Sequence, residues 1–441
     1  MIFGIPALTL GGIGLVIAAY VLLILSSILY LIKEKPLDFK LREVNYVPVT
    51  IEIATYNEGL LVRRSILSIK ELIYPKELLR VLILDDSDDR LSLGAVDAAA
   101  QELRNSGIAV EVIRRQSREG GKPGFLKQVE NLVSTPYIFI VDADFRLEPD
   151  SLEKAISYAS YNDFSFYQLR WSLEGNGLIS DIQRFLLQFH LSEEQEKVFS
   201  LGLPVKINGS CTLIKTKDLI SIGGWNPNTI TEDLDLAIRF YLAGKNGAYL
   251  PYLGGTGLTT PSFGSLFKQL DRWVVGDAQA LKAYGLKIIK STNFRRSVLA
   301  FIYLFNYIFS FFSVLIILSA IISYYSLPNY GYYTLLGLPI LGFLPVLFKR
   351  EYIPLYIVSF AYSIFMSMFL VKGLIKGEHE FTRTQKYKSR VSKWGPDRIM
   401  AACLCIATMI LSILGLTIGR FIPATVFLIY AVSFAVVTAF W

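Results

Sequence analysis

Residues 137–144 read Tyr-Ile-Phe-Ile-Val-Asp-Ala-Asp, an apolar and β-branched run that stops at two aspartates. A run of this length and composition, ending at polar residues, is typical of a buried strand. Two similar runs lie upstream: Val49–Ala54 before Thr55-Tyr56-Asn57-Glu58, and Val81–Leu84 before Asp85-Asp86. The three runs therefore predict three strands that each end in polar side chains.

Between these runs the spacing of apolar residues changes to that of helices. Leu61–Leu72 and Leu91–Arg104 carry apolar residues at helical intervals. Strands that alternate with helices predict a parallel, doubly wound α/β sheet. In such sheets ligands bind beyond the carboxyl ends of the strands. We therefore expect the three polar stretches to share one edge of the sheet and to form one site.

The composition indicates a membrane protein. The 441 residues are 53% hydrophobic, with a mean hydropathy of +0.44, which is high for a soluble chain. Residues 7–32 are almost wholly apolar, long enough to span a bilayer and too long for a cleavable signal peptide. Basic residues follow at 33–42, so the N-terminus is expected outside and residue 40 onward in the cytoplasm.

Apolar runs return after residue 297. They cover 297–324, 333–348, 352–371, 399–419 and 421–441. We expect about five spans in all, six if 333–348 crosses, with the basic segment 372–398 in the cytoplasm. The predicted organisation is one transmembrane helix in 1–35, a cytoplasmic domain in 40–290, and a transmembrane bundle in 291–441 with a cytoplasmic interface segment at 376–398.

Several function classes are excluded by the same data. The net charge of +7 comes largely from flanks of apolar runs, and no basic helix or basic-aromatic module points to nucleic acid. The three cysteines have neither disulfide-framework nor zinc spacing, and two histidines exclude a His-rich metal centre.

The pair in Asp142-Ala143-Asp144 is typical of a divalent metal site. Carboxylate oxygens suit Mg²⁺ or Mn²⁺, which neutralises a diphosphate leaving group. Alone the pattern also fits a solvated turn, but here it follows a buried strand. We take Asp144 and Asp142 as candidate metal ligands, with Asp142 also near the nucleotide.

Two other stretches are candidates for nucleotide binding. Asp85 and Asp86 can accept hydrogen bonds from a base, with Asp85 preferred, although a helix-capping turn is the alternative. The glycine-rich turn 120–124 carries Lys122, which can approach phosphates; the spacing is not that of a P-loop. Thr55, Tyr56, Asn57 and Glu58 offer further polar groups, and the same stretch is also a candidate helix N-cap.

The later motifs suggest catalysis and acceptor binding. Thr231 precedes Glu232 and Asp233 at the start of a periodic helix, where a cap residue and acids are expected. Asp233 is the candidate base for a hydroxyl proton, with Glu232 beside it. Residues 269–273 contain Gln269, Arg272 and Trp273, which can bind a diphosphate and stack on a sugar; an interfacial Arg-Trp anchor is the alternative. Asn208-Gly209-Ser210 is expected in the site floor.

In this order the motifs resemble family 2 glycosyltransferases, among them cellulose-synthase-like, glucomannan-synthase-like and hyaluronan-synthase-like enzymes. The similar stretches are 85–89, 121–124, 142–145, 208–210, 223–225, 231–235 and 269–273. Phe381, Thr384 and Lys386 lie in a segment similar to the family's gating loop, F-x-x-T-x-K. The resemblance covers about residues 48–390.

The resemblance implies a GT-A nucleotide-diphospho-sugar transferase domain inserted between transmembrane helices, acting by inversion with Mg²⁺ or Mn²⁺. By this resemblance Asp85 would contact the base, Lys122 would contact phosphates, and Asp144 would bind the metal together with Asp142. Asp233 would abstract the proton, and the diphosphate and the acceptor would be bound by Gln269, Arg272 and Trp273. The residues that would close over the nucleotide are Phe381, Thr384 and Lys386.

Three hypotheses follow from these motifs. The first is a processive β-glycosyltransferase of the cell membrane that extends a polysaccharide from UDP-glucose or GDP-mannose and exports it. The second is single transfer to a membrane lipid, as in ceramide glucosyltransferases; the size of the product distinguishes the two. The third is a transporter with a nucleotide-sensing domain, disfavoured because the spans contain almost no charges.

Overall fold

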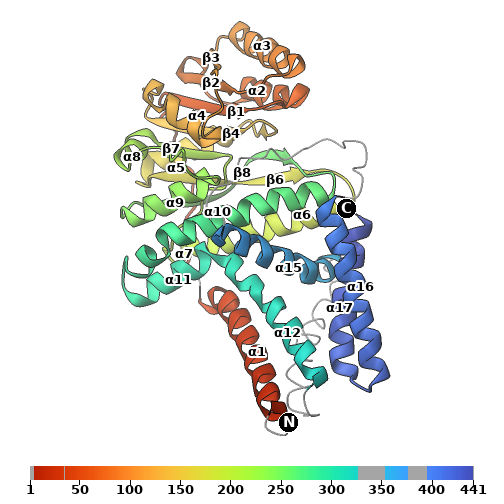
Figure 1. The fold of residues 1–441 in the computed structure, drawn as a ribbon. Coiled ribbons are helices and arrows are strands. Elements are labelled where there is room, and N and C mark those ends of the chain that lie inside the picture. Colours follow the sequence, from red (N-terminus) through yellow and green to blue (C-terminus); the bar gives the residue numbers. More distant parts are fainter. Residues whose placement is uncertain (1–3, 34, 326–352, 376–394, 441) are drawn as a thin grey trace.

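The computed structural model describes residues 4–33, 35–325, 353–375 and 395–440. Figure 1 shows a layered α/β part from which long helices extend. One sheet of eight strands runs through the α/β part in the order β3-β2-β1-β4-β7-β6-β8-β5. The strands are β1 (Val49–Thr55), β2 (Leu79–Asp85), β3 (Ala109–Ile113), β4 (Tyr137–Asp142), β5 (Arg146–Leu147), β6 (Phe166–Glu174), β7 (Thr212–Lys215) and β8 (Gly247–Leu258).

The half of the sheet that contains β3, β2, β1 and β4 is parallel, as predicted. The strands β1, β2 and β4 are mostly apolar and buried because helices cover both faces of the sheet. Val81 and Ile83 pack on the side of α2 (Val62–Ser68), α3 (Arg90–Asn105) and α5 (Ser151–Tyr161). Leu82 and Leu84 pack on the side of α4 (Gly121–Val129) and α9 (Glu232–Leu242).

The other half of the sheet departs from the prediction of a wholly parallel sheet. β7 is antiparallel to both of its neighbours, β4 and β6, so the sheet is mixed. Thr212 at the start of β7 pairs with Ile140 near the carboxyl end of β4. The turn at 208–210 before β7 is therefore brought to the edge of the sheet where Asp142 lies.

The connection that reaches β7 contains irregular helices. It comprises α6 (Leu178–Gln188), a π-helical segment η6 (Phe189–Gln195) and α7 (Glu196–Ser200), and α8 (Thr216–Ser221) follows β7. Short 3₁₀ turns occupy 28–31, 59–61, 69–71, 76–78 and 130–132.

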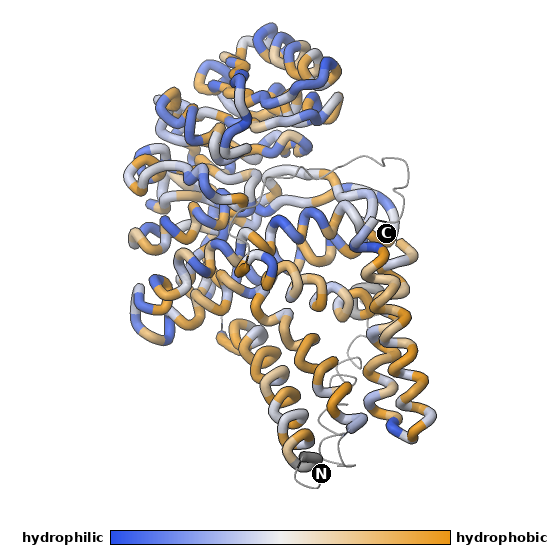
Figure 2. Tube along the Cα trace, in the orientation of Figure 1, coloured by the Kyte–Doolittle hydropathy of each residue, from blue (hydrophilic) through white to orange (hydrophobic). Residues whose placement is uncertain are grey.

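Long helices make up the remainder of the described chain. They are α1 (Gly4–Ser27), α10 (Phe263–Ile289), α11 (Phe294–Leu304), the 3₁₀ segment η7 (Asn306–Ser310), α12 (Phe311–Tyr325), α15 (Ile353–Ile375), α16 (Pro396–Thr417) and α17 (Phe421–Ala439). Five helical segments of the described chain are long and apolar enough to cross a membrane: 7–27, 306–325, 357–375, 396–417 and 421–439. We call these the apolar helices; the hydropathy colouring in Figure 2 shows that their residues are mostly hydrophobic.

The apolar helices match the predicted runs at 7–32, 297–324, 352–371, 399–419 and 421–441. Figure 1 shows α1, α12, α16 and α17 extending away from the sheet, whereas α15 lies across them, below α10. The predicted crossing at 333–348 falls outside the described residues, as does most of the predicted interface segment 376–398.

The helix α10 joins the α/β part to the apolar helices. One side packs on α15, where the rings of Phe267 and Phe365 are 4.5 Å apart. Asp271 forms an ion pair of 2.6 Å with Lys372, and a Cβ at Gly373 would lie 2.7 Å from the Ala278 side chain. The contact is thus close along the second half of α15.

Candidate active site

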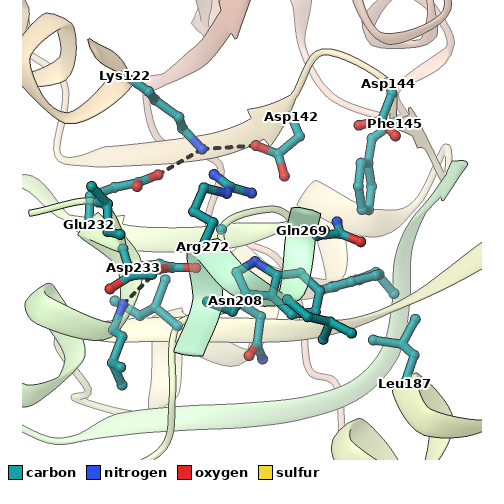
Figure 3. A pocket seen from close by; sticks show the side chains of 18 of the residues that line it. Lys122, Asp142, Asp144, Phe145, Leu187, Asn208, Glu232, Asp233, Gln269 and Arg272 are labelled. Atoms are coloured by element: carbon teal, nitrogen blue, oxygen red, sulfur yellow. Dashed lines mark hydrogen bonds and ion pairs between the residues drawn. The ribbon is translucent and has the colours of Figure 1, made fainter. Parts of the chain in front are cut away.

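A cavity of about 520 Å³ lies at the carboxyl ends of β1 and β4 and extends to the apolar helices. Figure 3 shows the side chains that line it. The predicted site residues in the lining are Thr55, Tyr56, Glu58, Asp86, Lys122, Asp142, Asp144, Glu232, Asp233, Gln269, Arg272 and Trp273. Two predicted residues, Asn57 and Asp85, are not among the lining residues, and Phe381, Thr384 and Lys386 lie outside the described part of the chain.

Lys122 connects the end of β4 to the start of α9. Its Nζ lies 2.9 Å from Asp142 Oδ1 and 2.9 Å from Glu232 Oε1 (Figure 3). Burial lowers the pKa of Lys122, but the two carboxylates more than offset this and raise it. The ammonium is therefore a fixed positive charge in the cavity. The turn before it is tight: Gly120 has φ 68°, and a Cβ there would lie 2.9 Å from the Gly124 backbone.

The two aspartates after β4 both line the cavity but have different backbone contacts. The Asp142 amide donates to Ser210 Oγ at 3.1 Å, and Asp144 Oδ2 accepts from the Leu258 amide at 3.2 Å. Burial raises the pKa of Asp142, Lys122 lowers it, and Asp144 raises it again. A positive ion between the aspartates would relieve this repulsion.

The donor set fits a hard divalent cation that takes most of its ligands from elsewhere. In the described part of the chain no group of three or more His, Cys, Asp or Glu residues is placed to hold a metal ion. Asp142 and Asp144 can supply two carboxylates, and Mg²⁺ commonly completes its coordination with phosphate oxygens and water.

The acidic pair after β2 is divided between two environments. Asp86 lines the cavity and receives two hydrogen bonds from Arg115, of 2.8 and 2.7 Å. Asp85 is 1% exposed and accepts from Arg114 Nε at 2.9 Å, outside the lining. The preference for Asp85 as the base contact stays a prediction, and Asp86 is the member that reaches the cavity.

The stretch after β1 is shaped by Asn57, which has φ 52°. Its Nδ2 donates to Asp88 Oδ1 at 2.7 Å, and its Oδ1 accepts from the Asp88 amide at 3.0 Å. These bonds tie the loops after β1 and β2 together. Tyr56 and Arg118 line the cavity beside them, with the guanidinium 3.3 Å from the ring centroid.

The first two residues of α9 carry adjacent carboxyl groups whose pKa values are shifted in opposite directions. Burial raises the pKa of Glu232, but Lys122 more than offsets this, so it is lowered. Burial and the Glu232 charge raise the pKa of Asp233 to about 7. Neighbouring carboxyls with diverging pKa values are the usual pattern of divided roles. Glu232 stays ionised and holds Lys122, while Asp233 can take up a proton near neutral pH.

The backbone also holds Asp233 in place. Its Oδ1 accepts from the Leu234 amide at 2.8 Å, and a Cβ at Gly209 would lie 3.2 Å from its Oδ2. The predicted cap differs in detail: Thr231 precedes α9, but its side chain makes no capping hydrogen bond. Instead the Thr231 side chain packs directly against Gly276 of α10.

The residues of α10 approach α9 from the side of the apolar helices. Gln269, Arg272 and Trp273 all line the cavity, and the charge of Arg272 lowers the pKa values of Glu232 and Asp233. Figure 3 shows Arg272 between Asp142 and Asp233. Trp273 keeps 36% of its surface exposed. A guanidinium and a flat apolar ring therefore lie next to the two catalytic candidates.

Several lining residues were not predicted from the sequence. They are Phe189, His190, Glu194, Lys206, Asp277, Asn306, Tyr307 and Tyr362. One signal was available for Asp277, because it follows Trp273 by four residues and so lies on the same helix face. The others come from segments that only the fold brings together.

Comparisons with known proteins identify related sequences and a similar structure. A family model described as Glycosyl transferase family group 2 matches residues 137–375, and one described as Glycosyl transferase family 2 matches residues 50–220. A probable glucomannan 4-beta-mannosyltransferase 11 of Arabidopsis thaliana is 30% identical over 260 residues, 58% of this chain and 59% of that protein. A probable glucomannan 4-beta-mannosyltransferase 7 of Oryza sativa subsp. japonica is 28% identical over 250 residues, 55% and 43% of the two chains. The matches thus cover about half the length of these relatives.

The solved structure of the mannosyltransferase PcManGT from Pyrobaculum calidifontis, in complex with GDP-Man and Mn²⁺, is similar in fold. It superposes with a TM-score of 0.64 over 83% of this chain and 98% of that one, at 15% identity. This likeness supports the predicted GT-A fold, with apolar helices before and after the α/β part in the chain.

Proposed function

The chain belongs to the family 2 glycosyltransferases, and on this premise we propose that it transfers a mannosyl unit from GDP-mannose to a hydroxyl group of a growing β-linked polysaccharide. The relatives named as glucomannan mannosyltransferases favour mannose over glucose. The observation that carries the proposal is Asp233, whose pKa of about 7 suits a base, within one cavity with Lys122 and Arg272.

In the proposed reaction Asp233 accepts the proton of the acceptor hydroxyl. The hydroxyl oxygen forms a bond to the anomeric carbon of mannose while the bond to the diphosphate oxygen breaks. GDP leaves with the electron pair. One direct displacement inverts the anomeric configuration and needs no nucleophile from the enzyme.

Positive charges are needed where the diphosphate leaves. Arg272 can bind phosphate oxygens with two parallel hydrogen bonds. Lys122 adds a second charge, since Asp142 and Glu232 hold its ammonium in the cavity. Asp142 and Asp144 would hold a Mg²⁺ or Mn²⁺ ion, which neutralises the leaving diphosphate when bound.

The nucleotide would lie against the ends of β1 and β2. Thr55, Tyr56, Glu58 and Asp86 line that part of the cavity. Asn57 would act by tying the loops after β1 and β2 together, whereas the direct contact of Asp85 with the base stays a prediction.

The apolar helices support an integral, multi-pass membrane protein. We infer a cytoplasmic catalytic domain from the basic residues at 33–42, which follow the first apolar helix. Asn306, Tyr307 and Tyr362 of the apolar helices line the same cavity as Asp233. An acceptor held there would meet the membrane part, which favours a product passed outward as it grows.

The test uses the full chain, purified in nanodiscs with Mn²⁺. Radiolabelled GDP-mannose and UDP-glucose are supplied separately, with short mannan and glucan acceptors, and the products are sized. We expect a long polymer from GDP-mannose, and none from the Asp233→Asn variant, which should still bind GDP. Transfer from UDP-glucose alone would overturn the donor, and label confined to lipid extracts would overturn the acceptor.

A further inference from the structure

Residues 208–211 form a turn, which we call the floor turn, between two side chains whose separation matters for the proposed reaction. A Cβ on Gly209 would lie 3.2 Å from Asp233 Oδ2 and 3.7 Å from Asp142 Oδ2. The Ser210 hydroxyl accepts a hydrogen bond from the Asp142 amide at 3.1 Å. A shift of the floor turn would therefore move the candidate base relative to the candidate metal ligand.

The backbone of the floor turn needs support from its surroundings. Gly209 has φ 74° and Cys211 has φ 53°, and a residue with a Cβ rarely keeps a positive φ unless its neighbours hold it. Gln168 of β6 provides one support. Its Oε1 accepts from the Asn208 amide at 2.8 Å, and its Nε2 donates to the Ser210 carbonyl at 3.0 Å. The sheet thus holds the main chain of the turn.

A second support comes from the π-helix η6, and Gln195 makes its first contact. Gln195 is 0% exposed. Its Oε1 accepts from the Lys206 amide at 3.0 Å, and its Nε2 donates to the Lys206 carbonyl at 2.8 Å. The Tyr303 hydroxyl of α11 donates to the same Oε1. These three bonds fix the Gln195 amide in one orientation, two residues before the floor turn.

His190 makes the second contact of η6, on the side chain of Asn208. Its Nδ1 lies 2.8 Å from Glu194 Oε2, and its Nε2 lies 3.1 Å from Asn208 Oδ1. Both partners are acceptors, and a neutral imidazole donates from one nitrogen only. Two arrangements satisfy the ring: a doubly protonated imidazole, or an Asn208 amide turned to donate its Nδ2, which is buried without a partner among the described residues. Both arrangements tie His190 to Asn208.

The π-helical geometry explains how His190 and Gln195 reach the same segment. With 3.6 residues per turn, residues five apart in an α-helix point about 140° away from each other. The i→i+5 bonds of a π-helix bring such residues onto one side instead. An α-helical path over 189–195 would therefore turn one of the two side chains away from 206–208.

We propose that η6 is a clamp that positions the floor turn between Asp142 and Asp233, with His190 and Gln195 as its positioning residues. The clamp deepens the proposed function and rests on it for the reaction that it serves. Both ring nitrogens of His190 are engaged with other side chains, which favours positioning over proton transfer by the imidazole itself.

The first test measures the clamp without turnover. Hydrogen–deuterium exchange is followed in peptides that cover 206–211 of the full chain in nanodiscs. A glutamine amide at position 190 reaches the place of Nε2 and can donate to Asn208 or accept from it, whereas an asparagine amide reaches only the place of Nδ1. The turn amides should exchange about tenfold faster in His190→Ala and His190→Asn, the size expected for one lost hydrogen bond. In His190→Gln they should stay within about threefold of wild type.

The second test measures transfer, with whichever nucleotide sugar the wild type uses. Misplaced reacting groups lower kcat more than they weaken donor binding. His190→Ala and His190→Asn should therefore lower kcat at least about tenfold while KM for the donor stays within about threefold. His190→Gln should keep kcat within about threefold of wild type, and Mn²⁺-dependent binding of GDP should persist in all three variants.

Gln183→Ala is the matched control for Gln195→Ala. The Gln183 amide of α6 makes the same pair of bonds to another segment: its Oε1 accepts from the Thr260 amide at 2.9 Å, and its Nε2 donates to the Thr260 carbonyl at 3.1 Å. Both variants should lose similar thermal stability. Only Gln195→Ala should speed exchange in the floor turn and lower kcat as His190→Ala does.

Each result decides a different part of the proposal. Unchanged exchange in His190→Ala and Gln195→Ala would overturn the clamp. Faster exchange with a normal kcat would overturn the positioning role, and a kcat as low in His190→Gln as in His190→Ala would assign the chemistry to the imidazole. A wild type that transfers from no nucleotide sugar would overturn the proposed function, and exchange would still decide the clamp.

Discussion

The acidic limb of the pH–rate profile should belong to Asp233, and Glu232 should set its position. Burial and the charge of Glu232 raise the pKa of Asp233 to about 7. Below that pH the base is protonated, so kcat/KM for the acceptor should fall about tenfold per pH unit. Glu232→Gln removes the neighbouring negative charge, so the limb should move to lower pH.

The expected size follows from the ionised fraction. At pH 6 a base of pKa about 7 is about 9% ionised, and one of pKa about 6 is about 50% ionised. A fall of about one unit, modest for a neighbouring charge, therefore raises the relative rate at pH 6 about fivefold. Each profile is normalised to its own plateau, because the variant also loses the 2.9 Å ion pair with Lys122.

The assay is initial transfer of radiolabelled mannose at saturating donor, between about pH 5 and pH 9. Asp277→Asn is the control, since burial also raises the pKa of Asp277 to about 7. Its limb should stay in place. A Glu232→Gln limb that remains near pH 7 would refute the reasoning, and a limb that disappears in Asp277→Asn would make Asp277 the titrating group.

Three other predictions concern stability and positioning. Burial raises the pKa of Glu52 to about 8, so the folded state keeps a proton that the unfolded state loses above about pH 4.5. The free energy of unfolding of the wild type therefore declines as the pH rises between these two values. Unfolding titrations should show the Glu52→Gln variant gaining stability relative to wild type, on the order of 2 kcal/mol between pH 5 and pH 8. If that gap is constant with pH, Glu52 is ionised in the fold. A Cβ at Gly276 would overlap the side chain of Thr231, so Gly276→Ala should destabilise by about 1–3 kcal/mol and lower kcat; normal kcat would mean that the start of α9 tolerates the shift. Lys372→Ala removes the 2.6 Å ion pair with Asp271 and should lower kcat a fewfold, with recovery in the charge-swapped Asp271→Lys/Lys372→Asp double variant; equal rates in all three proteins would exclude a role for this contact.

The first half of the sheet was predictable because its signals are local. The predicted strands at 49–54, 81–84 and 137–141 match β1, β2 and β4 within two residues. Buried parallel strands read as continuous apolar runs, so composition and length suffice to find them. The polar stretches that end them could be assigned to one edge of the sheet for the same reason.

The second half was not predictable in the same way. β8 contains Pro251 and several glycines, which weaken a strand signal. Gly254 is needed because a Cβ there would lie 2.8 Å from that of Cys211, a contact between distant segments. The antiparallel direction of β7 follows from the path of the preceding helices, and no local pattern records it.

The candidate site likewise has one part that local motifs predict and another part that only the fold reveals. Lys122 and Asp233 were predicted from motifs, but their connection through Glu232 required the relative positions of two separate segments, α4 and the start of α9. The choice between Asp85 and Asp86 depended on Arg114 and Arg115, which draw the two carboxylates to different sides. Lys206 and Tyr362 carried no signal, because each is an ordinary residue until the fold places it beside the cavity.

The packing of α10 on α15 bears on modularity. If the α/β part and the apolar helices were independent modules, either could be exchanged without changing the cavity. Here Trp273 and Asp277 come from a helix whose other face contacts α15, and Tyr362 of α15 reaches the same cavity. A transplanted anchor would alter the wall of the cavity, so chimaeras between relatives should inherit acceptor preference from their membrane part and donor preference from the α/β part.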